Sequence, residues 1–173
     1  QYSFLDKKAI IRVDFNVPLN NGEVTDNSRI VAASPTIKKI ISDGGSCVLM
    51  SHLGRPKGVD QSLSMGNIAK EVEHVLGSEI LLSKDVVGPD AKSKSKNLKP
   101  GEILLIENLR FHKEETEGDV VFAEKLSKLA DCYINDAFGT AHRAHASTTI
   151  IAQFFEHKFF GKLLEKEVLS IDK

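Results

Sequence analysis

The sequence predicts an α/β fold: a three-layer α/β/α, Rossmann-like domain with a mostly parallel sheet of about six strands. Short apolar runs alternate along the chain with segments whose apolar residues recur every three or four positions, which is the pattern of strands alternating with helices. The runs are continuously apolar, as expected of strands buried on both faces of a parallel sheet. They cover residues 9–13, 47–50, 80–82, 103–106 and 132–134.

The segments between these runs have helical periodicity and recognisable ends. They cover residues 30–41, 65–76 and 122–130. Ser64 is a favourable N-cap for the second helix, and Gly77 is a favourable residue to end it. The first helix stops at a pair of glycines, and the third follows a Gly-Asp pair. The alternation of strands and helices therefore predicts right-handed crossovers and a parallel sheet covered on both faces.

The length of the chain and the pattern near its end indicate how it is divided into domains. With 173 residues, the chain is large enough for one domain with its own core. We expect this domain to cover residues 1–160, with a phenylalanine cluster near its end in the core or at an interdomain surface. Residues 163–169 resemble the start of a new helix with nothing to pack against. We therefore expect residues 161–173 to begin an interdomain helix, and more protein to follow.

Composition narrows the class of function. The formal net charge is −1, from 23 basic and 24 acidic residues, which argues against a nucleic-acid partner. No apolar run approaches the roughly 18 residues of a membrane span, and no signal peptide is visible. Cys47 and Cys132 lie within apolar runs, which favours buried, reduced thiols over nucleophiles. A cytoplasmic protein is expected.

Polar and cationic residues follow four of the predicted strands. Because the carboxyl ends of parallel strands share one edge of the sheet, and ligands bind there, these residues predict a single anion site. Arginine binds carboxylates and phosphates through a planar fork of donors, and histidine also donates to anions. The cationic candidates are Arg12, Arg29, Arg55, Arg110, Arg143, His52, His142 and His145.

Asp14 and Asn16 indicate the rest of the ligand. An acceptor and an amide within a cationic site suit a hydroxyl group, so we expect a small acid that carries phosphate, carboxylate and hydroxyl groups. On its own, Asp14 could instead cap a turn, and Asn135-Asp136 could only order the backbone of the next loop. A single arginine at a strand end could be a surface ion pair, but four such ends together favour a ligand.

Two other kinds of site are disfavoured. His142 and His145, with Asp136 and Cys132 upstream, could suggest a metal site, but Arg143 between the histidines disfavours a cation, so none is expected. The chain also lacks both G-x-x-x-x-G-K-[ST] and a G-x-G-x-x-G after a strand, so no nucleotide-phosphate loop is predicted.

Four motifs together resemble the N-terminal half of the phosphoglycerate kinase family. They are residues 12–19 (RVDFNVPL), 51–56 (SHLGRP), 107–111 (ENLRF) and 135–145 (NDAFGTAHRAH). Members of this family have two α/β/α domains that face each other across a hinge. The resemblance implies that the N-terminal domain binds 3-phosphoglycerate or 1,3-bisphosphoglycerate, and that the C-terminal domain binds MgATP or MgADP.

The resemblance also implies a role for each candidate residue. Asp14 and Asn16 would contact the glycerate part of the ligand, and Arg29 would be catalytic, stabilising the transferring phosphoryl group. The phosphate and its surroundings would be bound by His52, Arg55, Arg110 and Arg143. The basic patch would be completed by Arg12, His142 and His145.

The implied reaction is reversible phosphoryl transfer between 1,3-bisphosphoglycerate and ADP in glycolysis. The C-terminal domain, with the Mg²⁺ and the ATP or ADP, is missing from this chain, so we expect a monomer that binds the phosphoglycerate, holds no cofactor and catalyses nothing alone. Two alternatives remain: an isolated small-anion binding module, and an RNA binder that uses the basic patch.

Overall fold

One twisted sheet organises the structure, a computed structural model that describes residues 2–137, 144–160 and 169–172. The strand order is β5-β6-β4-β1-β7-β8-β9. All neighbouring strands are parallel except β8 and β9, which are antiparallel. The strands are β1 (Lys8–Arg12), β4 (Ser46–Met50), β5 (Leu81–Leu82), β6 (Ile103–Leu105), β7 (Cys132–Asn135), β8 (His157–Phe160) and β9 (Leu169–Asp172).

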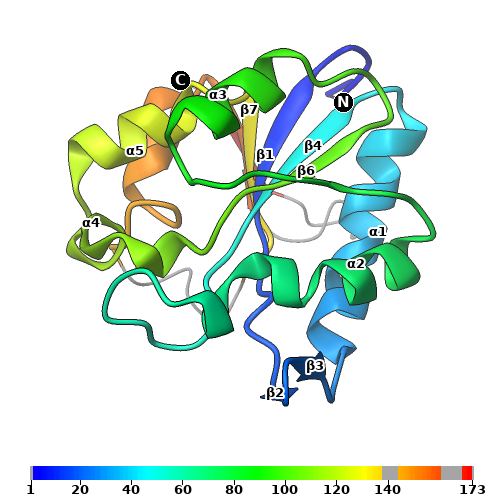
Figure 1. Cartoon of the computed structure of the whole chain (residues 1–173). Coiled ribbons are helices and arrows are strands. Elements are labelled where there is room, and N and C mark those ends of the chain that lie inside the picture. The colour runs from blue at the N-terminus through cyan, green and yellow to red at the C-terminus, as the bar shows by residue number, and fades with distance from the viewer. Residues whose placement is uncertain (1, 138–143, 161–168, 173) are drawn as a thin grey trace.

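Helices cover both faces of this sheet. In Figure 1, α1 (Ser28–Ser42) and α2 (Ala69–Leu76) lie on one side, and α3 (Pro89–Lys96), α4 (Lys113–Glu117) and α5 (Val120–Ser127) lie on the other. Short 3₁₀ helices cover Gln61–Leu63, Met65–Asn67, Leu109–Phe111 and Ile150–Phe154. A small hairpin, β2 (Leu19–Asn20) and β3 (Glu23–Val24), projects beyond the sheet. The three-layer α/β/α architecture predicted from the sequence is confirmed.

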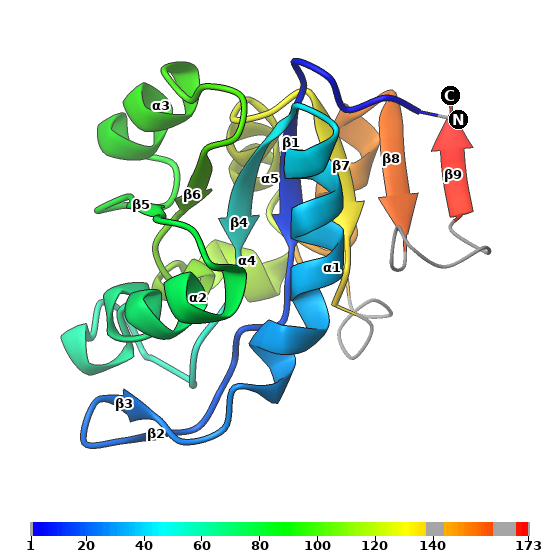
Figure 2. The same ribbon diagram turned by 90° about the vertical axis from the view of Figure 1, so that its right-hand side faces the viewer.

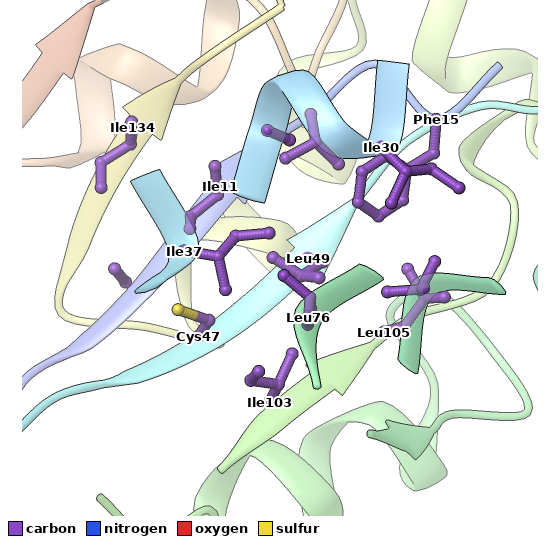
Figure 3. Close-up of a cluster of buried hydrophobic side chains, with 14 of the residues drawn as sticks. Ile11, Phe15, Ile30, Ile37, Cys47, Leu49, Leu76, Ile103, Leu105 and Ile134 are labelled. Carbon is purple, nitrogen blue, oxygen red and sulfur yellow. The ribbon is translucent and has the colours of Figure 1, made fainter. Parts of the chain in front are cut away.

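Alternation along the strands divides the interior into two cores. Ile11 and Leu49 join Ile30 and Ile37 of α1 in one core, shown in Figure 3. Their strand neighbours point to the other face, where Ile10, Val48 and Leu104 pack with Phe122 and Leu126 of α5. Both faces of each central strand are therefore buried, because a strand's side chains alternate between faces. This is why these strands are apolar at nearly every position.

The helix predicted over residues 65–76 starts differently in the structure. Ser64 caps the 3₁₀ helix Met65–Asn67, accepting from Gly66 N, and α2 itself begins only at Ala69. Gly77 ends α2 with φ +68°, as predicted.

The phenylalanine cluster near residue 160 belongs to the core: Phe155 and Phe159 are buried in opposite cores. Strand β8, which contains Phe159, was not predicted.

The chain beyond residue 160 also departs from the expectation. A helix was expected over residues 161–173, but Leu169–Asp172 forms β9, antiparallel to β8. Without β9, β8 would be an edge strand with unpaired backbone groups, and pairing with β9 satisfies them. Residues 161–168 lie outside the described residues.

The two cysteines are free and buried, as predicted. Burial raises the pKa of Cys132 to about 12 and also raises the pKa of Cys47, so both remain thiols. Within the described part of the chain, no helix is both long enough and apolar enough to cross a membrane.

Glycine is required at the end of α4, and a matched pair of variants tests this. Gly118 and Gly77 have nearly the same positive φ, but a Cβ on Gly118 would lie 2.4 Å from Ala144 O, whereas a Cβ on Gly77 would meet nothing within 4 Å. We expect Gly77→Ala to cost about 1 kcal/mol for its backbone conformation. Gly118→Ala should cost at least about 1 kcal/mol more because of the overlap. Equal losses in urea-unfolding free energy would contradict this.

Candidate anion-binding site

The parallel register brings four strand ends to one edge. Arg12 of β1 pairs with Met50 of β4 and with Asn135 of β7, and Leu49 of β4 pairs with Leu105 of β6. Figure 2 shows β1, β4 and β7 running toward the side of the molecule where the β2–β3 hairpin lies. The residues that follow these strands are therefore neighbours in space. The predicted sharing of one edge is confirmed.

Asp14, Asn16 and Arg29 are in direct contact at this edge. Arg29 Nη1 donates to Asn16 O at 2.6 Å and lies 3.4 Å from Asp14 Oδ1. Asp14 Oδ1 also accepts from Asn16 N at 3.1 Å, so the turn-capping alternative is correct alongside the contact with Arg29. Asn16 Oδ1 accepts from Gly54 N at 2.8 Å and so ties the loop after β1 to the loop after β4.

Arg12 and His52 form a buried pair beneath this edge. Arg12 is fully buried, and its Nη2 lies 3.0 Å from His52 Nδ1. A guanidinium can only donate, so Nδ1 must accept and the proton of the neutral ring must be on Nε2. Arg12 Nε donates to Ser147 Oγ at 2.8 Å, and Nη1 donates to Val13 O. Each of the three guanidinium nitrogens of Arg12 therefore has a partner in the protein, and the expected part of Arg12 in a basic patch stays a prediction.

His52 is neutral in this environment. Burial lowers its pKa to about 3, and the positive charges of Arg12, Arg110 and Arg29 and the nearby His145 add to the effect. His52 can therefore serve an anion as a neutral donor through Nε2.

Two residues that sequence reasoning did not assign to the site hold its loops together. Asn108, which follows β6, is fully buried, and its side chain accepts from Leu53 N and donates to Leu53 O at 2.8 Å. It also donates to Leu63 O at 2.9 Å. Glu107 accepts from Met65 N at 2.7 Å and from Ser64 Oγ at 2.6 Å. Both residues lie in a motif that the sequence singled out, which is the signal that could have found them.

The remaining candidates differ in how far they are placed. Arg55 is exposed and, within the described part of the chain, has no hydrogen bond or ion pair. Arg110 is half-buried and lines a hollow of about 400 Å³ with residues 56–58 and 111–114. His145 is buried. His142 and Arg143 lie outside the described residues.

The side chain of Asn135 orders the backbone of the following loop, as the alternative interpretation predicted, while for Asp136 the structure gives a backbone contact with β1. Asn135 Nδ2 donates to Thr148 O at 3.2 Å, and its Oδ1 accepts from Ala137 N at 3.0 Å. Asp136 N donates to Arg12 O at 2.9 Å. In the described ranges, no three His, Cys, Asp or Glu side chains gather in a way that could hold a metal ion.

Arginine is used selectively in this chain. All five arginines follow or end the four strands or open α1, while the lysines are spread along the sequence. Because arginine offers a fixed fork of donors that suits carboxylates and phosphates, this distribution favours recognition of such groups. The described edge is therefore chemically suited to a small, multiply charged anion.

The neutral state of His52 predicts a pH dependence of stability. The pKa falls from 6.5 to about 3 on folding, so between these values the unfolded chain binds more protons and stability decreases as pH decreases. His52→Asn, which keeps an acceptor for Arg12, should flatten this slope by up to about 1.4 kcal/mol per pH unit. Urea unfolding from pH 7 to pH 4.5 measures the slope, and identical slopes in the two proteins would contradict the assignment.

Comparisons with known proteins point to one family. The family model described as "Phosphoglycerate kinase" matches residues 1–173. Among curated relatives, the "Phosphoglycerate kinase" of Moorella thermoacetica is 51% identical over 97% of this chain and 43% of its own length. That of Porphyromonas gingivalis is 48% identical over 100% of this chain and 48% of its own length. This chain therefore spans less than half the length of these relatives.

Solved structures give the same result. The phosphoglycerate kinase of Pyrococcus horikoshii matches 96% of this chain and 42% of its own, with a TM-score of 0.85 and 34% identity. That of Coxiella burnetii matches 94% of this chain and 41% of its own, with a TM-score of 0.84 and 35% identity. With the family model matching the whole sequence and the fold matching solved members, this chain belongs to the phosphoglycerate kinase family.

Proposed function

We propose that the carboxyl edge of this sheet binds 3-phosphoglycerate or 1,3-bisphosphoglycerate, for reversible phosphoryl transfer with ADP or ATP in glycolysis. The observation that carries the proposal is that Arg12 contacts His52 while Arg29 contacts Asp14 and Asn16, all at or after the ends of strands that meet at one edge of the sheet. Phosphoryl transfer depends chiefly on positioning and on stabilising charge, which such an edge supplies.

Each group has a role that matches its environment. Arg55 is exposed and has no hydrogen bond or ion pair among the described residues, and Arg110 lines a hollow, so both are placed where a phosphate could reach them. Their guanidinium groups would bind the phosphate oxygens, together with Arg143, and His52 Nε2–H would donate to the same ligand. Asp14 and Asn16 would orient the glycerate part. His142 and His145 would add to the positive field.

Arg29 is the proposed catalytic residue. Its side chain is half-exposed and bound to Asn16 O and Asp14, so it is placed next to the groups proposed to orient the glycerate. A guanidinium in this place would stabilise the charge on the phosphoryl group during transfer. Such a residue contributes mainly in the transition state.

The nucleotide and its Mg²⁺ would be bound by protein outside this chain. The described residues offer no set of carboxylates suited to Mg²⁺, and the chain spans less than half of its relatives. We therefore propose that residues 1–160, with β9 paired at the edge of the same sheet, form the phosphoglycerate-binding domain and that this chain catalyses nothing alone. We further propose a monomer in the cytoplasm, and the two buried, free thiols support that reducing compartment.

Calorimetric titration tests the ligand. We expect 3-phosphoglycerate to bind this chain at low salt, and glycerate and MgATP not to bind. Arg55→Ala should weaken binding roughly tenfold to a hundredfold, the scale of one lost charged hydrogen bond, and leave stability unchanged. Lys92→Ala is the matched control, because it removes one exposed positive charge from α3.

The control distinguishes binding at a local site from attraction of the anion by any positive charge on the surface. Equal weakening by the Arg55 and Lys92 substitutions would contradict the local site, because attraction by surface charge in general would be reduced equally by both. Tight binding of RNA that survives about 0.2 M salt would instead favour the nucleic-acid alternative.

Arg29→Ala tests catalysis and needs an intact enzyme of the family that carries these residues. Because its proposed role belongs to the transition state, we expect kcat to fall by at least about tenfold while 3-phosphoglycerate affinity changes little. Asp14→Asn, which removes the carboxylate next to Arg29, should affect affinity more than kcat. A loss of affinity with unchanged kcat in Arg29→Ala would refute the assignment.

A further inference from the structure

A buried chain of hydrogen bonds leads from α4 to His52. Glu115 is fully buried, and its carboxylate accepts from Ser147 N at 3.0 Å and from Ser147 Oγ at 2.5 Å. Ser147 Oγ accepts from Arg12 Nε at 2.8 Å, and Arg12 Nη2 lies 3.0 Å from His52 Nδ1. One hydroxyl group therefore connects a buried carboxylate to a buried guanidinium and, through it, to the ligand edge.

The donor and the acceptor of each hydrogen bond in this series are fixed. Arginine only donates and a carboxylate only accepts, so the Ser147 hydroxyl must give its proton to Glu115 and receive Arg12 Nε–H. Arg12 Nη2 then donates to His52 Nδ1, which leaves Nε2–H as the single donor of the ring. Nε2 has no partner among the described residues.

We propose that Glu115 and Ser147 are positioning residues of the anion site, which act through Arg12 to hold His52 as a neutral Nε2–H donor for the ligand. The ligand part of this proposal rests on the proposed function. Neither residue needs to contact the ligand. Their effect on it passes through a guanidinium that is itself buried.

The Ser147 hydroxyl is not needed to attach the segment that begins at residue 144. Backbone contacts already attach this segment to α4, because Ala146 N donates to Glu115 O at 2.8 Å and Ser147 N to the Glu115 carboxylate. The Ser147 hydroxyl adds the connection to Arg12. Buried ionic groups are often no more stabilising than apolar residues of similar volume, so stability alone is a weak reason for this arrangement. The fixed orientation of His52 is the property it provides.

Nitrogen NMR of the histidine rings tests the positioning without any ligand. We expect His52 in the unmodified chain to show one neutral form, with the proton on Nε2. In Ser147→Ala, Arg12 loses an acceptor, and the ring should become a mixture of the two neutral forms. Glu115→Gln should alter the same signals, because its amide can donate to the Ser147 hydroxyl in competition with Arg12. Unchanged His52 signals in both variants would overturn the proposal.

Ser95→Ala is the matched control. Ser95 is also buried, and its hydroxyl donates to Lys92 O within α3, so this variant loses a buried hydroxyl of the same kind. It should leave the His52 signals unchanged. A change equal to that in Ser147→Ala would mean that the signals report general loosening, which would also overturn the proposal.

A double-mutant cycle with 3-phosphoglycerate tests the effect on the ligand. Ser147→Ala should weaken binding about tenfold. This loss should disappear when His52 is already alanine, because the effects of substitutions at residues linked by contacts are not additive. Equal losses in both backgrounds would overturn the role of Ser147 through His52. If the unmodified chain does not bind 3-phosphoglycerate, the proposed function fails, and the NMR spectra alone decide whether Ser147 and Glu115 position the ring.

Discussion

The positive charge of Arg12 is buried at the end of β1, between β4 and β7, and much of the surrounding structure compensates for it. A buried charge without partners is very costly, so the guanidinium needs acceptors within the protein. Besides the carbonyl of the adjacent Val13, these acceptors come from two distant parts of the chain, the loop after β4 and the segment after residue 144. Satisfying this one group therefore fixes how those loops meet.

The same constraint separates the cationic residues of the edge into two kinds. Arg12 is buried and donates to partners within the protein, so its proposed effect on a ligand passes through His52. Arg55 is exposed and Arg110 lines a hollow, which is the position that their proposed role in binding phosphate requires. Asn108 is buried and stabilises the loop after β4, because its side-chain amide pairs with both backbone groups of Leu53. A buried polar layer thus supports an outer layer that is available to substrate.

The sequence predicted the sheet because two-sided burial makes β1, β4, β6 and β7 continuously apolar, and this pattern is local. It also predicted that the edge residues would meet, since that follows from parallel topology. It could not predict the roles of Glu115 and Ser147, because their contacts join residues 32 positions apart and have no periodic signal. Strands β8 and β9 were missed because their pairing depends on the sheet edge and not on a local pattern.

The central claim is that the carboxyl edge of this sheet is one site for a phosphorylated acid. A crystal structure of this chain with 3-phosphoglycerate tests it most directly. The account predicts the phosphate within hydrogen-bond distance of the guanidinium groups of Arg55 and Arg110, and His52 Nε2 facing the ligand. It would be contradicted by a ligand seated elsewhere, such as among Lys8, Lys92 and Lys128 at the opposite edge.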